Sequence, residues 1–460
     1  MRRVLSSLAI AASVAYVLLY VGVALARMRY PYELEWMEGG MVEHVRRILE
    51  GKPLYAPPSL EFVSFLYPPG YYLVAAAVAS IAGIGFFPLR LLSFLSSLGV
   101  FALLYALARK ETGSWTGGVL AAGLFAATYA RAGGWLDLAR LDSFYLLTLL
   151  GAIFALREGR SPLGAVLAGV LAAAAFLTKQ SALVVLVPVL AWLFFVERRR
   201  AATAAGTAAL LAVAGVLFLQ RESGGWFGYY CFTLPAHHPR VPGGWWRFWV
   251  HDLIPALPLA PLMVVRRKPT WFVPVVAGAL VASSWSVRCV YGAEVNNLLP
   301  AFAGFSLLAA TWRRPGWKEG LVLAQLAWLV YAPGALVPSA ADRRAGDAVV
   351  ERLAQVPGEI FLPHHGYLAR RAGKREGAHT LAMDNVFLDD KGPARGALER
   401  EVRDALAARR FGAAVIESDR RYAPWILEGY APSERLVEAP GAFWPVSGGR
   451  LRPEWLARPR

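Results

Sequence analysis

The stretch LGAVLAGVLAAAAFLTKQSALVVLVPVLAWLFFV, residues 163–196, contains two apolar runs separated only by Thr178, Lys179 and Gln180. A helix of about 20 apolar residues crosses the roughly 30 Å of hydrocarbon in a bilayer. Each run approaches that length, and the basic sequence ERRR follows at 197–200. The stretch therefore predicts two membrane-spanning helices joined by a short polar turn that carries one lysine.

The same apolar pattern recurs along most of the chain. Hydrophobic residues make up 57% of it and charged residues only 17%, with a mean hydropathy of +0.42, whereas a soluble domain has about 25% charged residues. Because backbone in lipid must satisfy its own hydrogen bonds, we expect a polytopic α-helical membrane protein with about 11–13 spans. The candidate spans lie at roughly 4–26, 71–87, 88–108, 115–130, 141–156, 162–178, 181–196, 202–220, 252–265, 271–287, 298–312 and 320–338.

The net charge of +16 belongs mainly to the apolar part of the chain. Residues 341–460 contain 20 Lys+Arg against 17 Asp+Glu, a net of +3, so residues 1–340 carry the remaining +13. Basic loops of this kind fix membrane topology and contact anionic lipid, so we expect lipid and not nucleic acid as the partner. Cys231 and Cys289 are too few for a disulfide framework or a zinc site, which leaves a single bridge or free thiols.

The composition divides the chain into two domains. Residues 1–340 are expected to lie in the membrane, with outer loops at 27–66 and 221–251. Residues 341–460 are expected to form a small soluble α/β domain, because GEIFLPHH and AAVIES resemble buried strands and ALEREVRDALAARRFG resembles a helix closed by Gly412. His364 and His365 are expected at the surface, at the end of the first strand.

The basic loops predict which side of the membrane each segment faces. ERRR (197–200), RRK (266–268) and RRPGWK (313–318) are expected in the cytoplasm, with the C-terminal domain outside. Membrane crossings can be counted back from a cytoplasmic ERRR or forward from a cytoplasmic N-terminus. The two counts differ by one crossing between residues 67 and 108. Either 71–87 does not cross fully, or a basic loop lies outside.

An acidic cluster, ELEWMEGG at 33–40, follows the first span directly. An amphipathic stretch, GGMVEHVRRILEG at 39–51, comes next and is expected to lie in the membrane interface. The carboxylates of Glu33, Glu35 and Glu38 therefore stay close to the bilayer. Three interpretations of these carboxylates remain open. They are solvated loop charges, they form a proton or cation site of a transporter, or one of them is a general base for a reaction at the membrane surface.

Basic side chains also gather at predicted span ends. Arg131, Arg140 and Asp142 lie in YARAGGWLDLARLDSFYLL, and Lys179 lies in FLTKQSALVV. Arginine and lysine at a membrane boundary suit a phosphate, and with a carboxylate base and an apolar groove they suit a lipid-phosphate-linked substrate. The alternatives are a snorkelling Lys179 and a local Arg140–Asp142 ion pair that orders the loop.

Four further polar residues lie near predicted span ends. His237 and His238 in LPAHHPR are candidates to contact acceptor or phosphate, or are solvated, and no third ligand stands at a metal-binding spacing. Asn296 and Asn297 in GAEVNNLLPAF are either functional or helix-capping residues. The sequence specifies no cofactor; a divalent cation is the candidate, and the identity of any metal is unknown.

Five stretches in order resemble the GT-C superfamily of membrane glycosyltransferases, in particular family 39, the protein O-mannosyltransferase and aminoarabinose transferase group. The resemblance covers residues 1–200, and the remainder is similar only in architecture. The stretches are EGGMVEHVRRILEGKPLY, LYPPGYYLVAAAVASIAG, PLRLLSFLSSLGVFALLYALARKETG, LARLDSFYLLTLLGAIFALR and AGVLAAAAFLTKQSALVVLVP.

The resemblance implies an inverting enzyme of the EC 2.4 class in the cell membrane. It would transfer a sugar from a polyprenyl-phosphate donor to a glycan, lipid or protein hydroxyl on the extracytoplasmic side. Arg131, Arg140 and Lys179 would bind the lipid phosphate. The alternatives are a polytopic transporter or flippase of a lipid-linked or anionic substrate, and a non-catalytic protein that binds polyprenyl phosphate.

The resemblance also implies an acidic base in the first outer loop. Glu38 matches that position best, but relatives often have Asp-Glu where this chain has Met37-Glu38, so the base stays open between Glu35 and Glu38. Some relatives place an acidic and a basic residue before Pro-Pro, where this chain has Leu66 and Tyr67. A second acid would be Glu61 or Asp142, or is absent.

Overall fold

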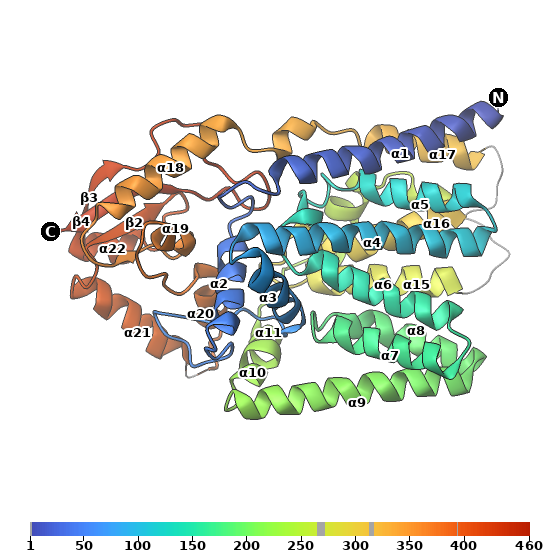
Figure 1. Ribbon diagram of the computed structural model, residues 1–460, viewed down its shortest axis with the longest axis horizontal. Coiled ribbons are helices and arrows are strands. Elements are labelled where there is room, and N and C mark those ends of the chain that lie inside the picture. Colours follow the sequence, from blue (N-terminus) through green and yellow to red (C-terminus); the bar gives the residue numbers. More distant parts are fainter. Residues whose placement is uncertain (1, 265–271, 312–316, 393) are drawn as a thin grey trace.

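The computed structural model, which describes residues 2–264, 272–311, 317–392 and 394–460, consists of a bundle of long helices with a smaller α/β domain on one end (Figure 1). The expected fold class is thus confirmed. RRK at 266–268 and most of RRPGWK at 313–318 lie outside the described residues.

The bundle helices run alongside one another and alternate in direction along the chain (Figure 1). α7 (Pro162–Phe176) begins where the sequence provides the expected signals: Ser161 accepts a hydrogen bond from the Gly164 N–H and is followed by Pro162 in the first turn. The helices are α1 (Arg2–Arg27), α4 (Phe86–Thr112), α5 (Trp115–Ala127), α6 (Asp142–Glu158), α7 (Pro162–Phe176), α8 (Ala182–Val196), α9 (Arg198–Glu222), α15 (Phe272–Arg288), α16 (Leu299–Thr311) and α17 (Trp317–Trp328).

Three helices of the described residues, α1, α4 and α9, are long and apolar enough to cross a membrane individually. A fourth candidate is the pair Lys318–Trp328 and Pro333–Ala354, which is bent by 59°. Other bundle helices are equally apolar but have only 10–17 residues. The predicted number of 11–13 spans therefore stays a prediction.

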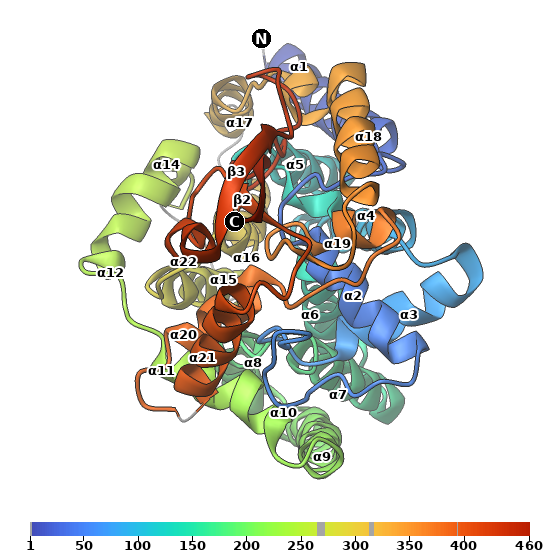
Figure 2. The ribbon, with the colours of Figure 1, turned by 90° about the vertical axis from the view of Figure 1, so that its left-hand side faces the viewer.

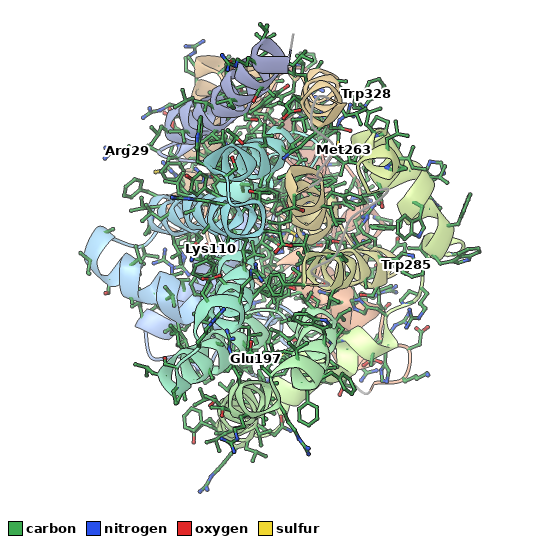
Figure 3. The ribbon with its side chains drawn as sticks, turned by 90° about the vertical axis from the view of Figure 1, so that its right-hand side faces the viewer. Arg29, Lys110, Glu197, Met263, Trp285 and Trp328 are labelled. Carbon is green, nitrogen blue, oxygen red and sulfur yellow. The ribbon has the colours of Figure 1, made fainter. Side chains whose placement is uncertain are left out.

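The short helices leave connecting segments at the end of the bundle that faces the C-terminal domain. α5 ends at Ala127 and α6 begins at Asp142; α7 ends at Phe176 and α8 begins at Ala182. Segments 128–141 and 177–181 therefore lie between the helix ends and the domain. Figure 3 views the bundle from the opposite end, where Lys110 and Glu197 are labelled.

The disputed crossing between residues 67 and 108 is explained by α3 (Gly70–Ala82), which directly follows Pro68 and Pro69. At its start the Gly70 N–H donates to the Leu177 carbonyl over 2.7 Å. Shortly after its end, the Phe86 ring lies 5.1 Å from the ring of Tyr367 in the C-terminal domain. Both ends of α3 thus lie on the domain side, so α3 does not cross the bundle.

The predicted amphipathic helix is α2 (Glu38–Leu49), whose residues Met41 and Val45 are buried. It lies between bundle and domain (Figures 1 and 2). Short helical turns make up the remaining connections: η1 (Trp135–Asp137), α10 (Trp226–Gly228), η2 (Tyr229–Thr233), α11 (Leu234–His237), α12 (Gly244–Arg247), η3 (Phe248–Leu253), α13 (Ile254–Ala256), α14 (Ala260–Val264), η4 (Val295–Leu298) and η5 (Pro333–Leu336).

The C-terminal domain contains a four-stranded sheet of order β1-β2-β4-β3, in which β1 and β2 are parallel and the other pairs antiparallel. The predicted strands and helix are present. The prediction that Gly412 closes the helix is wrong: α21 ends at Ala407, Arg409 adopts φ 53°, and the Gly412 N–H donates to the Glu359 carbonyl. The elements are α18 (Ala340–Ala354), β1 (Ile360–Phe361), α19 (Gly366–Arg371), α20 (Thr380–Phe387), α21 (Ala394–Ala407), β2 (Ala413–Glu417), α22 (Ala423–Gly429), β3 (Tyr430–Arg435) and β4 (Pro453–Pro459).

Polar contacts attach the domain to the bundle. The Ser447 N–H donates to the Leu34 carbonyl over 2.9 Å, next to the acidic cluster. His237 Nδ1 lies 2.8 Å from Asp389 Oδ1, which ties the 221–251 loop to the domain. The domain therefore covers the connecting segments of the bundle end.

Candidate active site

Glu38 anchors the first outer loop. Its carboxylate forms an ion pair with Arg90 of α4, over 2.6 Å from Nη2 to Oε2 and 2.9 Å from Nε to Oε1, and both side chains are 0% exposed. It also accepts the N–H groups of Leu34 and Ala139, over 2.7 and 2.6 Å. Both oxygens of Glu38 are therefore occupied, and they join the loop to α4 and to segment 128–141.

Glu35 is buried as deeply but bonded differently. Within the described part of the chain, neither of its side-chain oxygens has a hydrogen-bond partner. Arg140 Nη1 lies 3.6 Å from Oε2, and Gly448 packs so closely that a Cβ there would lie 2.8 Å from Glu35 Cγ. Burial raises the pKa of Glu35 to about 8, against the pull of Arg140. Glu35 is thus the acid of the loop that is able to exchange a proton near neutral pH.

Glu33 contacts the C-terminal domain. Its Oε2 lies 2.5 Å from His365 Nδ1, and its Oε1 accepts the Gly39 N–H over 2.9 Å. Burial raises the pKa of Glu33 well above its usual range and lowers the pKa of His365 to about 4. The prediction that His364 and His365 are surface residues is wrong, since both are buried at the junction with the bundle.

Lys179 lies in a buried polar network. Its Nζ donates to Asp142 Oδ1 and to Asn297 Oδ1, each over 2.9 Å, and Asn296 donates to the same Asp142 oxygen over 3.0 Å. Asn296 and Asn297 lie within η4, whose N-cap is Glu294, and their side chains join this network. The network fixes the ammonium group between segment 177–181 and the start of α6.

Arg140 and Lys179 line one cavity of ≈ 730 Å³. Arg140 Nη2 lies 3.5 Å from the Tyr67 hydroxyl, while Nε and Nη1 have no hydrogen-bond partner among the residues that the structure describes. His238 also lines the cavity. The bundle side of the cavity thus contributes two cations, one of them with unused donors, which suits an anionic group.

An apolar groove of ≈ 520 Å³ adjoins this cavity and is lined by α7, α8, α9 and Phe232. Leu183 lines the groove and Val184 the cavity; likewise Phe232 lines the groove and Cys231 the cavity. The two spaces share no described lining residue, but residues next to one another in the chain line both, so the groove and the cavity lie close together at α8 and η2.

The other predicted site residues lie apart from this cavity. Arg131 is exposed and is not among its described lining residues. His237 is bonded to Asp389, as described above, and Asp142 contributes by holding Lys179. Cys231 and Cys289 are free thiols. No group of three or more His, Cys, Asp or Glu positioned for a metal occurs in the described ranges.

Residues of the C-terminal domain, which the sequence did not indicate, complete the cavity: His364, Asp384, Asp419 and Arg421. His364 contacts Glu417 through Nδ1 and lies 2.9 Å from Asp419 Oδ2 through Nε2. The tandem HHG after a predicted strand was the available signal for His364. No comparable local pattern marks the two aspartates, because they come from α20 and from the segment after β2.

The His364 network predicts a pH dependence of stability. Burial opposes the charge on His364, but Glu417 and Asp419 outweigh it and raise the pKa of His364 to about 10. Since an unfolded histidine titrates near 6.5, this stabilisation is complete below about pH 6.5 and is lost as the pH rises through about 10. We expect His364→Gln to lower the thermal unfolding temperature by several degrees at pH 7 and by much less at pH 10.5. A difference that stays constant over this range would contradict the assignment.

Comparison with known proteins agrees with the motifs. Residues 67–220 match the sequence profile of the family described as dolichyl-phosphate-mannose-protein mannosyltransferase, and no match was found among curated proteins. The crystal structure of ArnT from Cupriavidus metallidurans bound to undecaprenyl phosphate is 14% identical, with a TM-score of 0.63 over 96% of this chain and 98% of that chain.

The archaeal oligosaccharyltransferase AglB from Archaeoglobus fulgidus, in complex with an inhibitory peptide and a dolichol-phosphate, is 12% identical, with a TM-score of 0.51 over 80% of this chain and 64% of that chain. At these identities the structural likeness shows a shared fold. Together with the matched segment, it confirms the resemblance to the protein O-mannosyltransferase and aminoarabinose transferase group.

Proposed function

We propose that this chain is a membrane glycosyltransferase that moves a sugar from a polyprenyl-phosphate donor to an acceptor hydroxyl. The observation that carries the proposal is the closeness of the apolar groove along α7, α8 and α9 to the cavity that contains Arg140 and Lys179. The groove suits a long apolar chain, and the two cations suit the phosphate at its end. The lipids bound in the two similar solved structures, undecaprenyl phosphate and dolichol-phosphate, have this combination of parts.

In the proposed reaction the acceptor oxygen attacks the anomeric carbon of the donor sugar. The bond from that carbon to the phosphate oxygen breaks, and its electron pair leaves with the polyprenyl phosphate. Arg140 and Lys179 stabilise the charge that develops on the phosphate. A carboxylate takes the proton from the acceptor hydroxyl. Direct displacement inverts the anomeric centre without a covalent enzyme intermediate.

Of the two candidate bases, we place Glu35 first. The oxygens of Glu38 are occupied by Arg90, Leu34 and Ala139, so a proton taken up there would break the anchor of the loop. Glu35 lies against Arg140, and its chain neighbours Trp36 and Met37 line the cavity. Arg140 lowers the raised pKa of Glu35 and so favours the carboxylate form that a base requires.

Glu35→Gln is expected to lower donor turnover about 100-fold or more, because general base catalysis contributes about 10²–10⁴-fold. Binding of sugar-free polyprenyl phosphate should stay close to that of the native chain. The measurement is turnover of a panel of polyprenyl-phosphate sugars by protein in lipid nanodiscs. Glu50→Gln, at the exposed end of α2, is the matched control. Full turnover by Glu35→Gln would exclude Glu35 as the base.

The basic residues support an extracytoplasmic site. Arg109 and Lys110 end α4, and the ERRR sequence at 197–200 follows α8, both at the bundle end opposite the C-terminal domain (Figures 1 and 3). Because α3 does not cross, the cytoplasmic N-terminus and these basic loops lie on one side, as the positive-inside rule requires. We therefore propose that the cavity and the C-terminal domain face away from the cytoplasm.

A flippase or transporter of a lipid-linked substrate is the alternative function. The cations and carboxylates of the cavity gather at one end of the bundle, beneath a domain that covers them, and this arrangement favours chemistry over passage through the membrane. Donor consumption with release of polyprenyl phosphate distinguishes the enzyme, whereas movement of intact lipid across vesicles distinguishes the flippase.

A further inference from the structure

The wall of the cavity that belongs to the C-terminal domain is polar and carries two aspartates beside an arginine and a histidine. Asp384 comes from α20, and Asp419 and Arg421 come from the segment that follows β2. Arg140 and Lys179 line the same cavity but belong to the bundle. One continuous space therefore has a cationic side for a phosphate and a carboxylate-bearing side for a different chemical group.

The two aspartates are fixed by neighbours that leave them facing the cavity. Asp419 Oδ2 lies 2.9 Å from His364 Nε2, and His364 is itself held by Glu417. Asp384 Oδ1 accepts from Arg421 Nε over 2.8 Å. Burial raises the pKa of Asp384 to about 7. These carboxylates are preorganised acceptors, and Arg421 supplies donors beside them.

A flat aromatic surface lies next to these groups. Trp36 of the acidic loop lines the cavity and stacks on His379, with ring centroids 5.6 Å apart and planes at 22°. Its ring lies 6.0 Å from that of His364. Paired carboxylate and guanidinium groups beside an indole match the faces of a sugar, since its hydroxyls bind polar groups while its C–H face packs on an aromatic ring.

Arg140 shows that the space between the two sides is built for a ligand. It is 2% exposed and keeps Nε and Nη1 without hydrogen-bond partners in the part of the chain described by the structure, although it lines the cavity. A buried guanidinium with unused donors is costly unless a bound group satisfies them.

We propose that Asp384, Asp419 and Arg421 of the C-terminal domain, together with Trp36, form a carbohydrate subsite that binds the hydroxyls of a hexose. The inference rests on the proposed function, in which the phosphate lies at Arg140 and Lys179. The hexose belongs either to the donor lipid or to the acceptor, because both present the same hydroxyl chemistry to this wall.

The test compares two lipids and a set of soluble sugars on the full chain in lipid nanodiscs. The probes are polyprenyl phosphate, the same lipid carrying mannose, glucose or galactose, and the methyl glycosides of these sugars. Binding is measured by native mass spectrometry for the native chain, Asp384→Asn and Asp419→Asn. Asp404→Asn, an exposed position on α21, is the matched control.

A donor subsite is indicated if the native chain binds one sugar-bearing lipid more tightly than polyprenyl phosphate and the Asn variants lose about tenfold of that affinity. An acceptor subsite is indicated if the lipids bind equally, and a methyl glycoside binds and is weakened about tenfold by the same changes. In both cases sugar-free polyprenyl phosphate should bind all variants equally.

The proposal is overturned if no sugar contributes to binding in the native chain, or if the Asn variants bind every probe as the control does. Trp36→Leu and Trp36→Phe provide a second test without altering a carboxylate; sugar binding should fall in the first and persist in the second. Failure of the proposed function has a different signature, since polyprenyl phosphate itself would then not bind, while the methyl glycosides would still test the subsite.

Discussion

Lys179→Met is expected to lower donor turnover about 100- to 1,000-fold, as removal of one preorganised donor to a developing charge does in other enzymes. Lys179 is fixed by Asp142 and Asn297 and lines the cavity. Loss of its ammonium group leaves the departing phosphate with Arg140 alone. The measurement is turnover of polyprenyl-phosphate sugars together with the affinity for sugar-free polyprenyl phosphate.

Lys110→Met is the matched control, because Lys110 lies at the opposite end of the bundle in an exposed ion pair with Glu158. Its turnover should equal that of the native chain. Lys179→Arg keeps the charge but does not match a pocket built for a compact ammonium group, so its turnover should recover only in part. Full activity of Lys179→Met would show that Lys179 does not bind the donor phosphate.

Arg90→Met is expected to lower the free energy of unfolding by about 3–5 kcal/mol, the cost of leaving a buried partner charge unpaired. Arg90 donates to Glu38 and also to the carbonyls of Tyr30 and Tyr32, over 2.6 Å each. Its loss therefore releases the whole acidic loop from α4. Thermal and denaturant unfolding in a mild detergent measure the effect.

The double variant Arg90→Met/Glu38→Met distinguishes an ion pair from simple packing. Since neither charge remains buried, it should be more stable than Arg90→Met alone. Arg109→Met, on the exposed end of the same helix, should unfold as the native chain does. Additive effects of the two single changes would show that Glu38 and Arg90 do not stabilise each other.

The motifs pointed to the side of the candidate site that we propose for the phosphate, but not to its other side. Lys179, Arg140 and Asp142 stand at the ends of apolar runs, where a polar residue is conspicuous against its neighbours. Arg90 was missed although it lies in the equally apolar PLRLLSF, because its role depends on Glu38, 52 residues earlier. Asp384 and Asp419 were missed because nothing local distinguishes them from solvated charges of a soluble domain.

Apolar run length and composition by themselves determined that this chain is a polytopic helical membrane protein with a small α/β domain at its C-terminal end. Both properties belong to individual segments, since the transfer of a helix into lipid depends on its own side chains. Tertiary structure alone decided that both ends of α3 lie on the domain side and that His364 lines a cavity. It also decided that the carboxylate of Glu38 has hydrogen-bond partners, while that of Glu35 has none among the described residues. Each of these depends on which distant groups meet a side chain, and the free energy of a buried charge is set by those partners.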